Sequence, residues 1–418
     1  MGVFVGIAAL SLLFPLLAQG ATKTLTQTPM ILVTTLSPSD QSVGMVVRGR
    51  MIYLIGTVTG VVSTDGFVQA LDSAGVVRWT LPLDNGSNEI ATAAAFDPAG
   101  NIWIAGSAQS TSASPTPSVS PSPTASTFSP TPSPTSTVLN PDAVTLDPTV
   151  PMREDLTSLT LWKVSPAGVL LASYRTELSV PFLVRGVGFS NNAIAAVGII
   201  STASGHAGFL IQADLNGNFG KPLIVGNTNT ELNAVVKKND GSLVLLGESS
   251  ETLVKQTVKG LRDGIIVSVA KTGKILRVIR SSDAKSTRAW QSGTNSFFLG
   301  GDSVIGAKTQ AVVTKFGSTL APAWTARFAS TGPALTADGP TTRFMTFSSS
   351  GPILGIKGWK PTRNSVLTLS LDARGVLKGA YGASLMATPM AIGYSRELGV
   401  VVLGRGPTGV SIFHALPR

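Results

Sequence analysis

The sequence predicts an all-β protein: a seven-bladed β-propeller of four-stranded antiparallel blades, closed by an N-terminal strand that completes the last blade. Three observations predict it. A short apolar run ending in glycine recurs about every 50 residues, most copies continue into two strands joined by a tight turn, and the last copy is one strand short. This period, with four strands in each unit, is typical of a propeller rather than a helical solenoid.

The composition agrees with many short strands. Of the 418 residues, 43% are hydrophobic and only 13% are charged, and there are 44 Gly and 26 Pro, as expected of buried strands joined by tight turns. There is no cysteine, which excludes disulfides, thiolate metal sites and a cysteine nucleophile. The net charge of +10 favours solubility or contact with an anionic partner, and we expect no nucleic acid.

Residues 1–20 predict a secretory signal peptide, because the apolar stretch Val3–Leu17 ends at a small-residue site before Ala21. No Lys or Arg precedes this stretch, and an uncleaved anchor is the alternative, although a spanning helix needs about 20 apolar residues. We therefore expect a secreted or cell-surface protein whose residues 21–418 form a single propeller domain. Membrane contact is expected only through a retained N-terminal segment.

The repeat can be followed by its glycines. The apolar runs end at Gly56, Gly106, Gly198, Gly247, Gly300, Gly355 and Gly404. In the first copy, Met51–Gly56 follows the strand Met45–Val47, and the strands Gly66–Leu71 and Val76–Leu81 flank the turn Asp72–Gly75. Four short strands therefore make one blade.

The last copy breaks off after three strands, of which the third is Val410–Leu416. The β-branched strand Met30–Leu36 has no partner nearby in the sequence. Circular closure by Met30–Leu36 accounts for both observations and removes the open edges that a linear stack of sheets would leave.

A Pro/Ser/Thr-rich segment at residues 108–156 interrupts the second blade between its second and third strands. Such polar tracts bury too little apolar area to offset the entropy of ordering, so we expect an extended, disordered insertion. Its two ends are expected to lie close together. The run Ile90–Gly106 before it supplies the first two strands of this blade.

At Gly66–Leu81, Gly208–Phe219 and Val366–Lys378 the chain resembles bacterial seven-bladed β-propeller repeats, in which an apolar strand leads into Asp-x-x-Gly. The resemblance implies the fold, and it implies no ligand because the recurring residues are turn and packing positions. Asp72, Gly75 and Trp79 also give a looser similarity to quinoprotein dehydrogenase repeats. The turn is one residue shorter here and no cysteine pair exists, so no cofactor is expected.

One face of such a ring carries the blade-to-blade connections and the loops between second and third strands. Basic residues expected on this connection face are Lys255, Lys259, Arg262, Lys308, Lys357, Lys360, Arg363 and Arg405. The best candidate binding site is the loop around Trp359 together with Arg405, because cations beside an exposed aromatic suit a protein or an anionic envelope polymer. The alternative is an ordinary basic loop whose Trp359 packs against a neighbouring blade.

Glu89, Glu177 and Glu231 are also expected at blade-to-blade connections. If Glu89 and Glu231 converged within about 10 Å, they could act as acid and base on a glycan. His206 and His414 stand far apart in the sequence, so no metal site is expected. We predict a monomeric, non-catalytic binding or scaffold protein, with an extracellular carbohydrate-active enzyme as the alternative.

Overall fold

The computed structural model describes residues 24–36, 41–59, 63–110, 152–190, 193–238, 240–282 and 284–416. The expected signal peptide and most of the expected insertion lie outside these residues. Every regular element of the described residues is a β-strand. None of them forms a helix long and apolar enough to cross a membrane.

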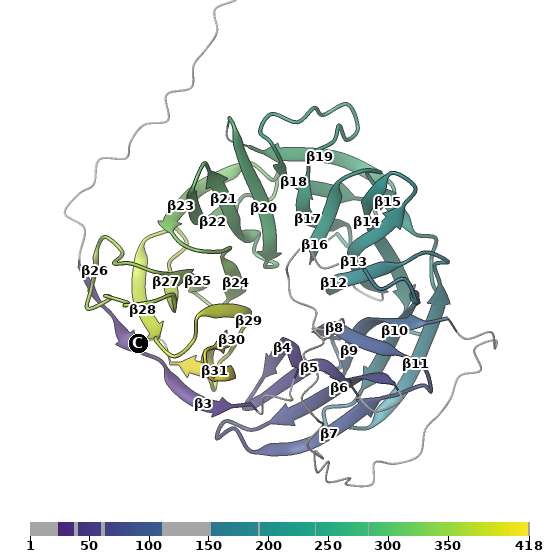
Figure 1. Ribbon diagram of the computed structural model, residues 1–418, viewed down its shortest axis with the longest axis horizontal. Coiled ribbons are helices and arrows are strands. Elements are labelled where there is room, and N and C mark those ends of the chain that lie inside the picture. The colour runs from purple at the N-terminus through teal and green to yellow at the C-terminus, as the bar shows by residue number, and fades with distance from the viewer. Residues whose placement is uncertain are drawn as a thin grey trace, which may run out of the picture.

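The described strands form seven blades arranged in a ring around a central axis (Figure 1). Blade 1 contains β4 (Gln41–Arg48), β5 (Met51–Thr59), β6 (Thr64–Leu71) and β7 (Val77–Leu83). Blade 2 contains β8 (Glu89–Phe96), β9 (Ile102–Gln109), β10 (Leu156–Val164) and β11 (Leu170–Glu177). Blade 3 contains β12 (Phe182–Ser190), β13 (Ala193–Thr202), β14 (Gly205–Asp214) and β15 (Leu223–Val225).

Blades 4 to 7 complete the ring. Blade 4 contains β16 (Thr230–Lys237), β17 (Leu243–Ser249), β18 (Asp263–Val269) and β19 (Ile275–Ser281), and blade 5 contains β20 (Ser286–Gly293), β21 (Phe298–Ile305), β22 (Lys308–Phe316) and β23 (Pro322–Ala329). Blade 6 contains β24 (Leu335–Asp338), β25 (Arg343–Ser349), β27 (Ser365–Leu371) and β28 (Leu377–Ala383). Blade 7 contains β29 (Thr388–Ser395), β30 (Gly399–Gly406), β31 (Gly409–Ala415) and β3 (Ile31–Thr35). Within each blade successive strands are antiparallel, so the predicted fold class is confirmed.

The core lies between the blades. The second and third strands of a blade are buried on both faces, as in β17 and β18, where every residue is buried. They read as continuous Val/Ile/Leu runs for this reason. Aromatic rings fill the wedges between blades, and Trp103, Trp162 and Trp290 are completely buried.

The N-terminal strand closes the ring as predicted. In blade 7, β3 pairs antiparallel with β31, with Ile31 opposite His414. Met30 and Leu36, at the two ends of β3, are buried in different hydrophobic clusters. The chain thus ties its beginning to its end through main-chain pairing and through two buried side chains.

The segment before β3 is also ordered, which the sequence did not predict. β1 (Leu25–Thr26) pairs parallel with β26 (Ile356–Lys357), and β2 (Thr28–Pro29) pairs parallel with β28. The N-terminal segment therefore lies along the outside of blade 6 before it enters blade 7 (Figure 1).

The recurring glycine belongs to a recurring β-bulge. In blades 1, 2, 3, 4, 5 and 7 the first strand carries one extra residue opposite the second strand: Val43, Thr92, Arg185, Asn233, Gln291 and Met390. The bulge brings a carbonyl oxygen of the first strand against the glycine. In blade 2, a Cβ on Gly106 would lie 1.8 Å from the Ile90 oxygen, so only glycine fits.

Two of the seven glycine assignments were wrong. In blade 5 the glycine at the bulge is Gly301, whose Cβ would lie 1.9 Å from the Ala289 oxygen, and not Gly300. In blade 6 the second strand is β25, and Gly355 lies in the loop that follows it. The described β24–β25 pairing has no bulge, so this blade needs no glycine at that position.

The aspartate of the recurring turn between the third and fourth strands bonds to the backbone of its own turn. The Asp72 carboxylate accepts hydrogen bonds from the backbone N–H groups of Ala74 and Val76, and Asp214 makes the same bonds in blade 3. These aspartates therefore stabilise their own turns.

The two ends of the insertion in blade 2 lie close together, as expected. Gln109 lies opposite Leu156, so the chain leaves and re-enters the blade at adjacent positions.

Candidate functional site

The predicted aromatic residue of the binding loop is not on the surface. Trp359 is only 4% exposed and packs with Ile353 and Ile356 in the core of blade 6. Its indole Nε1 donates to Ser349 Oγ at 3.4 Å. The expectation of an exposed Trp359 was therefore wrong and the alternative of a packed Trp359 holds, because the apolar side chains of its own loop fold back with it.

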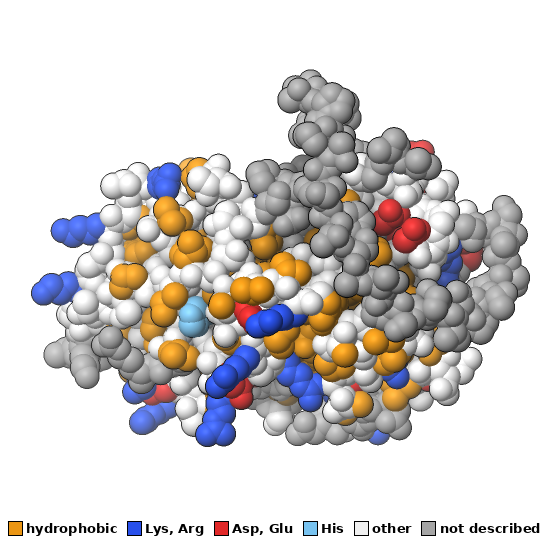
Figure 2. All heavy atoms as spheres, turned by 90° about the horizontal axis from the view of Figure 1, so that it is seen from below, with side chains coloured by type: hydrophobic (Ala, Val, Ile, Leu, Met, Phe, Trp, Pro, Cys, Tyr) orange, Lys and Arg blue, Asp and Glu red, His pale blue; other side chains and the backbone are white. Residues whose placement is uncertain are grey.

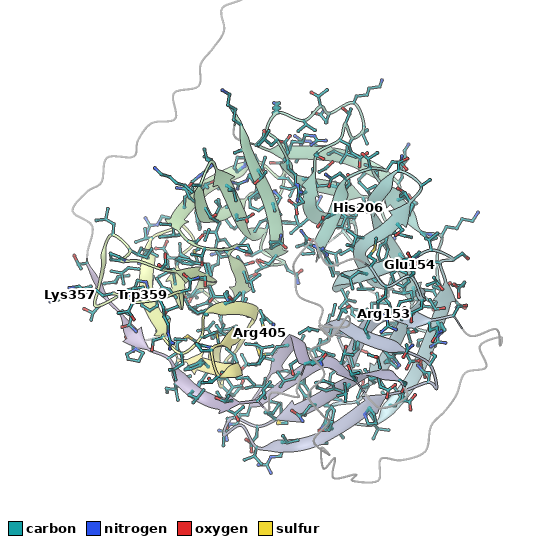
Figure 3. The ribbon with its side chains drawn as sticks, in the orientation of Figure 1. Arg153, Glu154, His206, Lys357, Trp359 and Arg405 are labelled. Carbon is teal, nitrogen blue, oxygen red and sulfur yellow. The ribbon has the colours of Figure 1, made fainter. Side chains whose placement is uncertain are left out.

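The basic residues of that loop form no joint site with Arg405. Lys357, Lys360 and Arg363 are exposed, and the loop reaches the outer rim of blade 6, where β26 meets β1. Figure 3 shows Lys357 at this rim, whereas Arg405 lies on blade 7 nearer to the axis. The structure thus keeps the predicted loop cations on the surface but does not bring Arg405 to them.

The other predicted cations differ in their surroundings. Lys255 and Lys259 are exposed in the loop between β17 and β18, and Lys308 is exposed at the start of β22. Arg262 is different, because its Nη1 lies 3.0 Å from Glu248 Oε2. Arg262 therefore neutralises an internal carboxylate, and the exposed lysines remain as the available charges.

The two predicted acid/base residues do not form a pair. Glu89 begins β8 in blade 2 and is completely buried, with Oε1 at 2.8 Å from Arg175 Nη2. Burial raises the pKa of Glu89, while the Asn85 N–H and the Arg175 guanidinium oppose that rise. Glu231 lies in blade 4, separated from Glu89 by blade 3, and has its own partners.

Glu231 belongs to a buried charge network across blades 3 and 4. Its Oε2 lies 3.0 Å from Arg185 Nη1, and its Oε1 lies 3.3 Å from His206 Nε2. Arg185 Nη1 also donates to Asn233 Oδ1 at 2.8 Å, and Asn233 Nδ2 donates to the Trp290 carbonyl of blade 5. Bulged residues of two neighbouring blades therefore link three blades in one chain of hydrogen bonds.

The carboxylate that the structure does bring beside Glu231 is Glu248. The two residues lie opposite each other on β16 and β17. Burial raises the pKa of Glu248 to about 7, nearby Glu231 adds to the rise, and Arg262 opposes it. Sequence reasoning missed Glu248 because it stands inside an apolar strand, one residue after Gly247. Because Gly247 lies opposite Leu232, the antiparallel register places the next residue, Glu248, opposite Glu231. That register was the signal in the sequence that could have identified Glu248.

Replacing Glu248 by Gln is expected to remove a pH-dependent loss of stability. In the unfolded chain the carboxyl titrates near 4.5, while the folded protein holds its proton until about 7. The folded state binds more protons between these values, so stability falls as the pH rises through them, by about 3 kcal/mol at most. Urea unfolding at about pH 5 and about pH 7.5 measures this. Equal losses in wild type and Glu248→Gln would contradict it.

Three carboxylates meet between blades 1 and 2. Oxygen atoms of Asp65, Asp84 and Glu89 all lie within 4.8 Å of one another, a donor set of the kind that hard divalent cations prefer. Arg175 already supplies a positive charge to Glu89. Seryl and backbone groups satisfy other oxygens of the cluster, such as Ser63 Oγ donating to Asp65.

Comparisons with known proteins address the fold. No protein-family profile and no curated protein matches the chain. The WD40 domain of Toxoplasma gondii coronin has a TM-score of 0.50 at 10% identity, covering 96% of this chain and 88% of that one. The Pan2 WD40 domain of Neurospora crassa has a TM-score of 0.51 at 10% identity, covering 95% and 97%. The chain is a β-propeller similar in fold to WD40 domains.

Proposed function

We propose that this propeller is an exported, non-catalytic binding protein that presents a rigid, basic surface to a protein partner outside the cell or at its surface. The fold supports a scaffold role, since a closed ring of paired strands has few movable parts and displays loops at fixed positions. Export is proposed from the apolar segment Val3–Leu17 alone.

The observation that carries the proposal is the distribution of charge. Three acids of the connection face, Glu89, Glu231 and Glu248, are buried beside arginines. Glu177 is exposed and accepts hydrogen bonds from Ser110 and Ser158, and the lysines of the loops are exposed as well. The net charge of +10 is therefore carried by the surface, where it attracts acidic partners over a distance. Figure 2, which views the ring from the side of β3 and β7, shows basic side chains prominent and acidic ones few.

The test is a pull-down with the immobilised protein from cell-envelope fractions. We expect a protein partner that is retained at about 50 mM salt and largely released at about 300 mM, because exposed charges are screened beyond about 8–10 Å at physiological salt. Treatment of the fraction with protease should abolish capture. Capture that survives protease would instead assign the surface to an anionic envelope polymer and would contradict the protein partner.

Tests of the blade 6 loop should change its exposed cations and not its tryptophan. Trp359→Ala removes a buried ring and is expected to cost about 3–5 kcal/mol of stability, so any loss of binding would be ambiguous. Lys357→Glu with Lys360→Glu alters only exposed side chains. That pair isolates surface charge from folding.

A second function is favoured by one observation, the Glu231–Glu248 pair. Burial raises the pKa of Glu248 to about 7, so its carboxyl can gain or lose a proton near neutral pH, as the general acid of glycan hydrolysis does. Its neighbour Glu231 lies 3.0 Å from Arg185 Nη1 and 3.3 Å from His206 Nε2. In this alternative the protein is an extracellular carbohydrate-active enzyme. Release of reducing sugar from envelope polysaccharide, abolished by Glu248→Gln, would establish it in place of the binding role.

A further inference from the structure

A groove lies on the outer rim of blade 4, and its lining residues do not belong to the buried charge network of Glu231 and Arg185. The loop between β17 and β18 extends beyond the ring next to β19 (Figure 1). Between this loop and β19 is a cavity of about 420 Å³, open to solvent, whose walls include Val254, Gln256 and Lys259 from the loop and Leu276 and Arg277 from β19.

The loop wall is fixed in place by Arg280, whose side chain is only 3% exposed. Its guanidinium donates to the carbonyl oxygens of Ser249, Glu251 and Gln256, and Nη1 lies 3.3 Å from Asp263 Oδ2. One buried side chain of β19 thereby holds both the beginning and the middle of the loop. The groove is consequently preformed, which lowers the entropy cost of binding.

The tip of the loop is strained in a way that exposes an apolar side chain. Leu253 and Gln256 exchange two backbone hydrogen bonds around a two-residue turn. Both turn residues have left-handed backbones, with φ of 44° at Val254 and 65° at Lys255. A β-branched residue rarely adopts this conformation, which costs about 1–3 kcal/mol. Leu253 is buried, so the turn anchors one side and presents Val254, which is 60% exposed.

The groove is basic, apolar and bordered by an open sheet edge. Leu276 is 60% exposed, as Val254 is, and Lys255, Lys259 and Arg277 are exposed around them. β19 is the last strand of its sheet, and no strand of the described residues pairs with its outer edge. An extended peptide can pair with such an edge through its main chain while alternate side chains enter the groove.

The nearby acids are engaged in hydrogen bonds and an ion pair within the protein. Residues 250–281 contain only two, Glu251 and Asp263. The Glu251 carboxylate accepts hydrogen bonds from the backbone N–H groups of Asn227, Thr228 and Asn229. Asp263 is completely buried and is paired with Arg280. The exposed charge of this region is therefore positive.

We propose that this groove binds an extended, acidic segment of a partner protein as an added strand on β19, with apolar side chains of the segment against Val254 and Leu276 and its carboxylates against Lys259 and Arg277. The inference rests on the proposed binding function and names its site and the chemistry of its partner. It also gives the strained turn at Val254 a role, since the turn holds an apolar contact in place before binding.

The test uses the full chain and a fluorescein-labelled eight-residue peptide of alternating Glu and Val. We expect binding that weakens about tenfold in the variant Lys259→Glu with Arg277→Glu, because two exposed ion pairs are lost and replaced by repulsion. The matched control is Arg374→Glu with Arg396→Glu, which makes the same charge change at exposed residues of blades 6 and 7 and should leave binding within about twofold. Thermal unfolding should be unchanged in both variants, since all four residues are exposed.

Two altered peptides test the chemistry. An alternating Lys and Val peptide should not bind, and the Glu and Val peptide N-methylated at alternate residues should bind about tenfold more weakly if its main chain pairs with β19. Equal effects of the blade 4 variant and the control variant, or full binding of the N-methylated peptide, would overturn the proposed binding of a strand in the groove.

The groove and the proposed function can fail separately. If the envelope pull-down captures a protein that wild type and the variant Lys259→Glu with Arg277→Glu hold equally well, the groove is wrong and the binding function stands. If the peptide binds as expected but no protein is captured from the envelope, the groove stands and the proposed partner outside the cell is wrong.

Discussion

Gly106→Ala is expected to destabilise the protein by about 3 kcal/mol or more. The new Cβ would lie 1.8 Å from the Ile90 carbonyl oxygen and 3.0 Å from the Trp162 ring. Neither neighbour is the free end of a flexible side chain, so β8 must shift and the bulge at Thr92 must change. Thermal unfolding should show a lower midpoint, by about 4 °C or more for a chain of this size.

Gly332→Ala is the matched control. A Cβ at Gly332 would meet nothing within 4 Å, so this change should leave the midpoint within about 1 °C. In Gly247→Ala the Cβ would lie 1.8 Å from the backbone carbonyl oxygen of Glu231, so this variant should lose stability as Gly106→Ala does. Small and equal shifts in all three variants would show that the bulge does not require glycine.

Deleting residues 1–36 is expected to open the ring. The deletion removes β3, which leaves the outer edge of β31 unpaired, and it removes the buried side chains of Met30 and Leu36. These two side chains alone contribute about 3–6 kcal/mol, and an open edge favours association with other chains. Size-exclusion chromatography should show self-association, and thermal unfolding should show a broader, earlier transition.

Two further chains separate closure from the segment before it. A chain lacking residues 1–29 loses β1 and β2 but keeps β3, and it should remain monomeric with a modest loss of stability. A synthetic peptide of residues 24–36 added to the chain lacking 1–36 should restore the higher midpoint by pairing with β31. If the chain lacking 1–36 stays monomeric and equally stable, closure by β3 contributes little.

Much of the fold was predictable because the recurring residues of the repeat, glycine and aspartate, are ones that the local backbone geometry requires. Gly106 and Gly247 are needed where a bulge presses a carbonyl against them, and Asp72 is needed where a carboxylate must accept turn N–H groups. Blade 6 was harder to place because its described first strand pairs without a bulge. Gly355 matched the pattern only by chance, as it lies in a loop with positive φ.

The candidate site was less predictable because burial and pairing are decided between blades. Trp359 and Lys357 are close in the sequence, yet one is in the core and the other is exposed. Glu231 and Glu89 fit one pattern in the sequence, yet each is neutralised by an arginine of a different strand. No local signal distinguishes Arg262, which pairs with Glu248, from Lys259, which stays at the surface.

The sequence by itself determined the class of fold, the closing strand Met30–Leu36 and the excess of basic residues, because strand alternation, turn chemistry and net charge are local or additive. The tertiary structure alone decided which charges remain at the surface. Burial of Glu248 and Asp263 beside arginines depends on strands meeting across and within blades, and so does the groove between Val254 and Leu276. Desolvation and pairing are properties of these contacts, which no single strand contains.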